Sequence, residues 1–131
     1  MIVVDASVIV TALADDGADG DRTRRRLRDE RLIAPHLIDL EVVSAWRRLA
    51  AAGDLDQRRA ELALEDLRAL RMERVPHRPL LKRCWELRDT LTVYDAAYVA
   101  LAEVLNVTLV TADARLAGAS RLTCEIELIR P

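Results

Sequence analysis

The sequence alternates between short apolar runs of β type and longer stretches with helical periodicity, and this alternation limits the possible folds. Strands are expected at residues 2–4, 32–34, 72–75, 108–111 and 125–129. Helices are expected at residues 7–14, 22–31, 37–52, 55–70, 79–88 and 92–105, with a helical turn at 114–119. No repeat, low-complexity tract or linker interrupts this alternation, so we expect one domain over residues 1–131.

Strands that alternate with helices favour a parallel sheet, because parallel neighbours are joined by crossover connections that cover both faces of the sheet. We therefore expect an α/β domain with a central, mostly parallel sheet and helices on both faces. In such a sheet, sites form outside the carboxyl ends of the strands. This rule separates, among 22 acidic residues, those that follow a strand or begin the next helix.

Four acidic residues meet this condition. Asp5 ends the first strand, and Asp113 follows the fourth. Glu41 lies just over a turn into the helix after the second strand, and Asp95 lies at the start of a later helix. Each also has a purely structural explanation, since three of them stand where helices or turns are capped and Glu41 lies at the edge of an apolar helix stripe.

Taken together, the four acids indicate chemistry, because unrelated caps have no reason to converge on one edge of one sheet. Carboxylates in close proximity repel one another, and a cation relieves that repulsion. Mg²⁺ and Mn²⁺ prefer carboxylates and waters as ligands and complete their shell with substrate phosphates. Such an ion activates a bound water and neutralises charge on phosphorus. The pattern therefore predicts phosphodiester hydrolysis.

Four motifs contain these acids: Asp5-Ala6-Ser7 after the first strand, Glu41 early in the third helix, the run from Tyr94 to Ala102, and Thr111-Ala112-Asp113 after a late strand. In order and spacing they resemble the PIN-domain family and, within it, the VapC toxins of type II toxin–antitoxin systems. The resemblance covers nearly the whole chain.

This resemblance implies an endoribonuclease that acts on RNA. It implies a Mg²⁺ or Mn²⁺ site with the ligands Asp5, Glu41, Asp95 and Asp113 and the polar neighbours Ser7 and Thr111. It also implies a cognate VapB-type antitoxin, a homodimer and a larger toxin–antitoxin assembly. Two alternatives stay open: a non-catalytic PIN-like interaction module, and a PIN nuclease outside a toxin–antitoxin system.

Three other classes of α/β protein do not fit. A phosphate-receiver module needs a lysine at the end of its last strand, and the one lysine, Lys82, lies in a predicted helix. A haloacid-dehalogenase-type phosphatase needs Asp-x-Asp where this chain has Asp5-Ala6-Ser7. The four glycines form no Gly-rich turn after a strand, which excludes a P-loop or Rossmann nucleotide site.

Composition excludes further classes. A net charge of −2 excludes binding of nucleic acid by bulk positive charge, although without the four candidate ligands 18 acidic residues face 20 basic ones. Only 3% of residues are aromatic, which argues against a base-stacking platform. Cys84 and Cys124, in predicted regular structure, are typical of buried thiols in the cytoplasm. Neither a signal peptide nor a membrane span is expected.

Two surface features allow two interpretations each. Six arginines within 22–31 follow an acidic segment and indicate either a solvated helix face or an RNA contact. Leu40 and Val43 lie opposite the apolar stripe of their helix, which indicates either a fully buried helix or a partner or dimer surface. The family resemblance favours the partner surface, with an antitoxin segment packed on these helices and blocking the acidic edge.

Overall fold

Five short strands form one sheet in the computed structural model, which describes residues 1–130. The strands are β1 (Ile2–Val4), β2 (Leu32–Pro35), β3 (Glu73–Val75), β4 (Leu109–Thr111) and β5 (Ile126–Leu128). Their order is β3-β2-β1-β4-β5, and every neighbouring pair is parallel. The strand order reverses between β1 and β4, and this reversal is the point at which open α/β sheets form their ligand sites.

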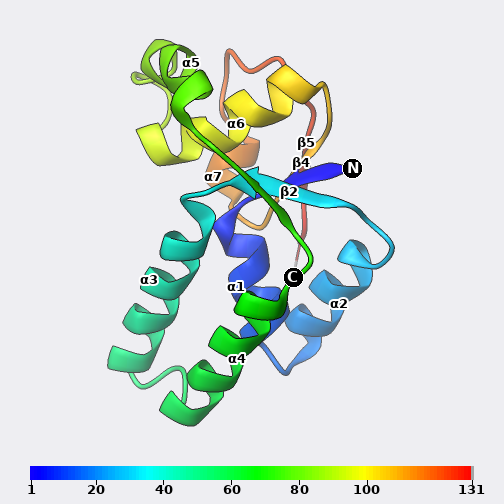
Figure 1. Ribbon diagram of the computed structural model, residues 1–131, viewed down its shortest axis with the longest axis vertical. Helices are drawn as coiled ribbons and strands as arrows, with labels where there is room; N and C mark the ends of the chain where they lie inside the picture. The colour runs from blue at the N-terminus through cyan, green and yellow to red at the C-terminus, as the bar shows by residue number, and fades with distance from the viewer. Residues whose placement is uncertain (131) are drawn as a thin grey trace.

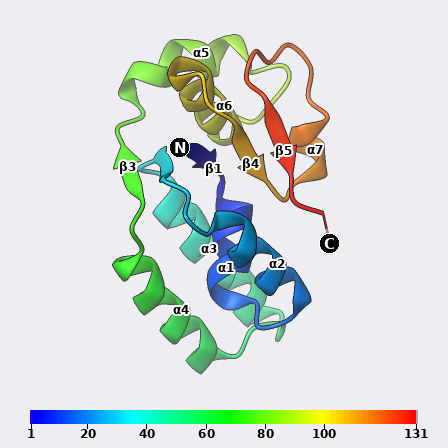
Figure 2. The same ribbon diagram turned by 90° about the vertical axis from the view of Figure 1, so that its right-hand side faces the viewer.

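Helices cover both sides of the sheet (Figures 1 and 2). They are α1 (Ala6–Ala14), α2 (Ala18–Leu27), α3 (Ile38–Ala51), α4 (Gln57–Ala69), the 3₁₀ turn η1 (Arg78–Leu80), α5 (Leu81–Glu86), α6 (Val93–Leu105) and α7 (Ala114–Ala117). Helices α1 to α4 lie on one side, and α5 and α6 lie on the other. The predicted α/β architecture is confirmed, and none of the helices in residues 1–130 has the length and apolar character of a membrane span.

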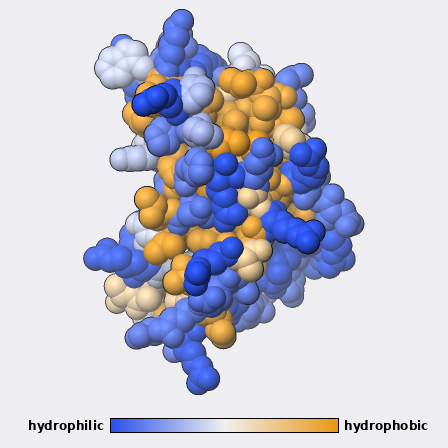
Figure 3. All heavy atoms as spheres, viewed as in Figure 1, coloured by the Kyte–Doolittle hydropathy of each residue, from blue (hydrophilic) through white to orange (hydrophobic). Residues whose placement is uncertain are grey.

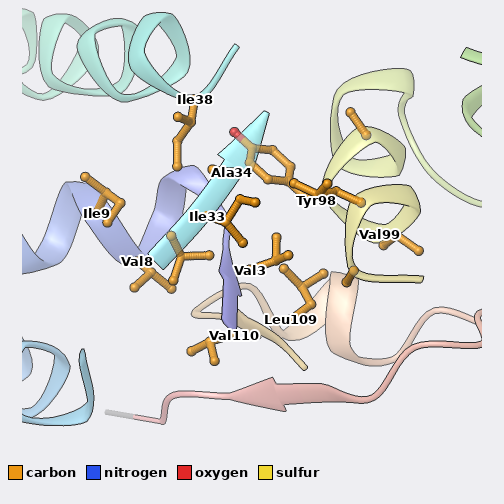
Figure 4. Packing of buried hydrophobic residues seen from close by; sticks show 14 of the residues in the cluster. Val3, Val8, Ile9, Ile33, Ala34, Ile38, Tyr98, Val99, Leu109 and Val110 are labelled. Atoms are coloured by element: carbon orange, nitrogen blue, oxygen red, sulfur yellow. The ribbon is translucent and has the colours of Figure 1, made fainter. Parts of the chain in front are cut away.

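The core forms around the central strands because their residues are apolar on both faces. Val3, Ile33 and Leu109 pack between α1 and α6 (Figure 4). The residues of α6 from 96 to 102 are all buried, and four of these seven are alanines, so the helix backbone lies close to the sheet. A crossover helix runs opposite to its strands, so α6 begins at their carboxyl edge.

Helix α2 begins earlier than the predicted range of 22–31 and also ends earlier. Asp19 and Asp21 therefore lie in its first turn, where negative charge is favourable for the helix dipole, rather than in a loop. The chain leaves the helix just before Asp29, whose positive φ of 64° is incompatible with a continued right-handed helix.

The arginines of α2 are only partly a solvated face. Arg24 donates to the carbonyl oxygens of Ala12 and Asp15, at 2.9 and 2.8 Å, and so ties α2 to the end of α1. Arg26 makes two hydrogen bonds to Glu127 of β5, at 2.5 and 3.0 Å. These two side chains have a structural role, and an RNA contact by the remaining arginines stays a prediction.

The structure corrects one expectation about burial and decides between the two interpretations of helix α3. Cys124 lies in a bend before β5 and is only partly buried, whereas Cys84 is buried in α5 as expected. Helix α3 is not fully buried: Ile38, Val42 and Trp46 face the core, but Leu40 is 77% exposed. Hydrophobic residues also reach the surface over α6, as Figure 3 shows in its upper part. The second apolar face of α3 is therefore available to a partner.

Candidate functional site

The four candidate acids come from four elements that begin at the carboxyl edge of the sheet. Asp5 directly follows β1 and caps α1, and Asp113 follows the neighbouring β4 and caps α7. Glu41 and Asp95 lie in the first turns of α3 and α6. Burial is the main cause of the raised pKa of Asp5, Glu41 and Asp95; the charge of Asp95 adds to it at Asp5 and Glu41, and the charge of Asp113 adds to it at Asp95. The charge of Asp95 is therefore coupled to those of the other three acids.

Asp5 is the most enclosed of the four, with 5% of its surface exposed. The hydroxyls of Ser7 and Thr111 each donate to one of its carboxylate oxygens at 2.5 Å. The backbone N–H of Val8 adds a third, longer hydrogen bond of 3.3 Å. Burial raises the pKa of Asp5 to about 6 against the lowering effect of these three donors. The carboxylate is thus held in one orientation at the strand reversal.

Ser7 and Thr111 also join the ends of β1 and β4. The Ser7 hydroxyl accepts a hydrogen bond from the backbone N–H of Ala112, and the Thr111 hydroxyl accepts one from that of Asp113, both at 3.0 Å. Each hydroxyl therefore bonds both Asp5 and the turn that carries Asp113. This double bonding fixes the two acidic turns relative to each other.

Glu41 is oriented by a residue that the sequence analysis did not single out as a site residue. The buried Tyr98 reaches from α6 toward the start of α3 (Figure 4), and its hydroxyl donates to Glu41 Oε1 at 2.5 Å. Burial raises the pKa of Glu41, whereas this hydrogen bond lowers it. Tyr98 follows Asp95 by three residues and so shares its helix face, a spacing that was readable from the sequence.

Arg115 bridges the two remaining acids. Its Nη2 atom lies 3.0 Å from Asp113 Oδ2 and 3.5 Å from Asp95 Oδ2. The hydrogen bond that Arg115 donates to Asp113 holds the pKa of Asp113 below its usual value. Burial raises the pKa of Asp95, although the hydrogen bond with Thr92 and the charge of Arg115 act in the opposite direction. No sequence pattern distinguished Arg115 from the other arginines.

The donor set suits a hard divalent cation in its chemistry, because all four candidates offer carboxylate oxygens. In residues 1–130, no three acidic, histidine or cysteine side chains are arranged to hold one metal ion together. The positive charge beside Asp95 and Asp113 is instead the guanidinium of Arg115, whose side chain is 74% exposed. The four acids therefore fit a metal ion by ligand type and charge. Arg115 must first leave Asp95 and Asp113.

The raised pKa of Asp5 predicts a pH-dependent stability. The Asp5 carboxyl keeps its proton up to about pH 6 in the folded state but only up to about pH 3.8 in the unfolded state. The protonated carboxyl therefore stabilises the fold fully below about pH 4, and this stabilisation is lost as the pH rises through 6. It amounts to about 3 kcal/mol. Asp5→Asn cannot titrate, so the difference in unfolding free energy between wild type and variant should change across this range. A constant difference would contradict the assignment.

Comparison with known protein families gives one match over most of the chain. The model of the PIN domain matches residues 2–122. The chain is 46% identical to ribonuclease VapC1 of Mycobacterium tuberculosis over 129 residues, which is 98% of this chain and 97% of VapC1. It is 45% identical to ribonuclease VapC9 of the same organism, with 98% of each chain covered.

Solved structures show the same fold. The Sarcin-Ricin loop cleaving toxin VapC20 of Mycobacterium tuberculosis superposes with a TM-score of 0.70 at 17% identity, and each chain is covered completely. A chain of VapBC2 from Rickettsia felis, solved bound to a DNA fragment from its promoter, superposes with a TM-score of 0.66 at 16% identity. That match covers 96% of this chain and 98% of the other.

Proposed function

The chain belongs to the PIN-domain family, and we propose that it is a metal-dependent endoribonuclease, the toxin of a VapBC-type toxin–antitoxin pair. One domain over residues 1–131 would carry the activity. The observation that supports this function best is the enclosed carboxylate of Asp5, which two hydroxyls hold at the strand reversal and which the charge of Asp95 reaches. Such an arrangement keeps negative charge where a cation and a phosphate are to meet.

Each residue of the site has a definite task in this proposal. The ligands of Mg²⁺ or Mn²⁺ would be Asp5, Glu41, Asp95 and Asp113. When bound, such an ion activates water and neutralises charge at the reacting phosphate. Ser7 and Thr111 orient Asp5, and Tyr98 orients Glu41. These hydrogen bonds fix the carboxylates before the substrate arrives, which reduces reorganisation during the reaction.

Arg115 must release Asp95 and Asp113 before a cation can share them. Its ion pairs are exposed and screened by solvent, so the guanidinium leaves at little cost. Its own charge raises the electrostatic potential of this edge in the meantime. The carboxylates are therefore not left without a counter-charge in the absence of metal.

The experiment that tests the function is RNA cleavage by the purified chain after complete removal of any antitoxin. With Mg²⁺ or Mn²⁺ present, we expect total cellular RNA to be cut at discrete positions. A folded protein that cuts no RNA under these conditions would instead support the non-catalytic interaction module. Cleavage that a co-expressed neighbouring VapB-type protein does not inhibit would support a nuclease outside a toxin–antitoxin system.

We also propose that the chain acts in the cytoplasm as a homodimer, and that a VapB-type antitoxin joins it in a larger assembly. An apolar surface supports the dimer: Leu40 of α3 and Tyr94 of α6 are 77% and 64% exposed and line one cavity of about 280 Å³ with Leu37. Exposed apolar patches of this kind are typical of protein interfaces.

Leu40→Glu is expected to convert the dimer to a monomer, because it places a charge in the apolar contact. Sedimentation velocity would measure the change, with circular dichroism to show that the fold is retained. Val104→Glu is the matched control, since Val104 is a comparably exposed aliphatic residue, 71%, near the other end of α6. A dimer that survives Leu40→Glu, or a monomeric wild type, would overturn this surface assignment.

A further inference from the structure

A second cavity opens directly beside the acidic edge. It has a volume of about 400 Å³ and lies between the end of α5, the start of α6 and α7. Its wall includes Asp95 and Arg115 of the candidate site, together with Arg88 and Thr90 from the segment between α5 and α6. Cavities of about this size hold small organic ligands, so there is room for one nucleotide.

Arg88 is fixed in this wall by its contact with Trp85. Its guanidinium carbon lies 4.3 Å from the centre of the Trp85 ring, and its Nη1 donates to the Trp85 carbonyl oxygen at 2.9 Å. Trp85 is itself 65% exposed, so the pair stands at the surface. A cation over an aromatic face is stabilised, and the guanidinium plane keeps a defined orientation.

The charge of Arg88 is also available to a ligand. Arg83 of α5 is engaged by Glu103, whereas within residues 1–130 no carboxylate lies within 4 Å of the Arg88 guanidinium. Thr90 adds a hydroxyl group to the wall, and the carboxylate of Asp89 adds an acceptor. An unpaired planar cation with hydroxyl and carboxylate neighbours suits a phosphate, a base and a ribose hydroxyl better than an apolar segment.

We propose that this cavity binds the nucleotide adjoining the cleaved phosphodiester of a single-stranded RNA, with Arg88 contacting both a phosphate and a base. The inference rests on the proposed function, because the cavity shares Asp95 with the candidate catalytic edge. The guanidinium plane, backed by Trp85, stacks on the base, and its N–H groups meet the phosphate. A single stack of this kind agrees with the low aromatic content of the chain.

The test measures binding in a background of Asp5→Asn, so that the RNA stays intact. The probe is a short, fluorescein-labelled single-stranded RNA of randomised sequence, in the presence of Mg²⁺. Arg88→Gln should weaken binding about tenfold and lower the slope of log affinity against log salt by about 0.7. Arg88→Lys keeps the charge and should keep the slope, but it loses the stacked plane and so part of the affinity.

Arg68→Gln is the matched control, because the Arg68 side chain is 73% exposed on α4, on the other side of the sheet. It should leave the RNA affinity unchanged. Tryptophan emission gives a second readout, since Trp46 is buried and Trp85 is exposed. RNA should quench this emission, and Trp85→Phe should remove the quenching.

Unchanged RNA affinity in Arg88→Gln would overturn the proposal. An Arg88→Gln variant that sediments as a smaller species than wild type but binds RNA with unchanged affinity would also overturn the proposal. Arg88 would then lie in a contact with a second copy of the chain. Cleavage and binding by the wild-type chain distinguish failure of the cavity assignment from failure of the nuclease function. If wild type cleaves RNA and Arg88 has no role in binding, only the proposed nucleotide site is rejected. If RNA binding depends on Arg88 but wild type cleaves no RNA, the nucleotide site is supported and the nuclease function is rejected.

Discussion

Replacing Asp5 by asparagine is expected to reduce RNA cleavage about a thousandfold or more while leaving the protein at least as stable as wild type. Asparagine keeps an oxygen that can accept the hydrogen bond from Val8 and so retains the cap of α1. It removes the negative charge, however, and with it the strongest proposed attraction for a cation. It also removes the repulsion between Asp5 and Asp95.

Loss of activity without loss of stability separates a catalytic role from a structural one, because active-site charges are commonly unfavourable for folding. Cleavage in Mg²⁺ and urea unfolding should be measured on the same preparations at pH 7. Asp66→Asn, at an exposed position of α4, is the control and should change neither quantity. Wild-type activity in Asp5→Asn would contradict the role of Asp5 in the reaction.

Removal of divalent ions is expected to stop cleavage completely, and Mg²⁺ or Mn²⁺ should restore it. The same ions should stabilise the folded wild type, because a ligand that binds only the folded state at a hundred times its Kd contributes about 2.7 kcal/mol. The physical reason is the repulsion among the carboxylates around Asp95, which a cation relieves. Asp5→Asn should show much less stabilisation.

Thermal or urea unfolding with and without the ion measures the stabilisation, and cleavage with and without a chelator measures the dependence of the reaction on metal. Ca²⁺ at the same concentration controls for a general effect of ionic strength, since its larger shell suits different geometry. Equal stabilisation of wild type and Asp5→Asn would place the ion elsewhere. Undiminished cleavage in excess chelator would rule out a metal-dependent reaction.

The fold and the positions of the four acids could be predicted because both follow from local pattern. An apolar run followed by an aspartate marks the end of a strand, as at Asp5 and Asp113. The order of strands and helices then determines which strand ends meet. Thr92 is similarly readable as the cap of α6, and its hydroxyl accepts from the backbone N–H of Asp95 as expected.

The partners of these acids could not be predicted in the same way, because they depend on contacts between distant segments. The bridge from Arg115 to Asp95 and the bond from Tyr98 to Glu41 each join two helices. The bonds from Arg26 to Glu127 likewise connect residues far apart in the chain, and no local periodicity indicates them. Such contacts appear only when the side chains are placed in space.

The end groups of the cleaved RNA distinguish hydrolysis by water from attack by the neighbouring ribose 2′-hydroxyl. In the proposed reaction an external water attacks phosphorus, so the neighbouring 2′-hydroxyl is not consumed. We therefore predict that the wild-type chain in Mg²⁺ leaves linear phosphate monoesters and intact 2′-hydroxyls at its cleavage sites. Products that end in 2′,3′-cyclic phosphates would show attack by the ribose hydroxyl and would contradict hydrolysis at the carboxylate edge.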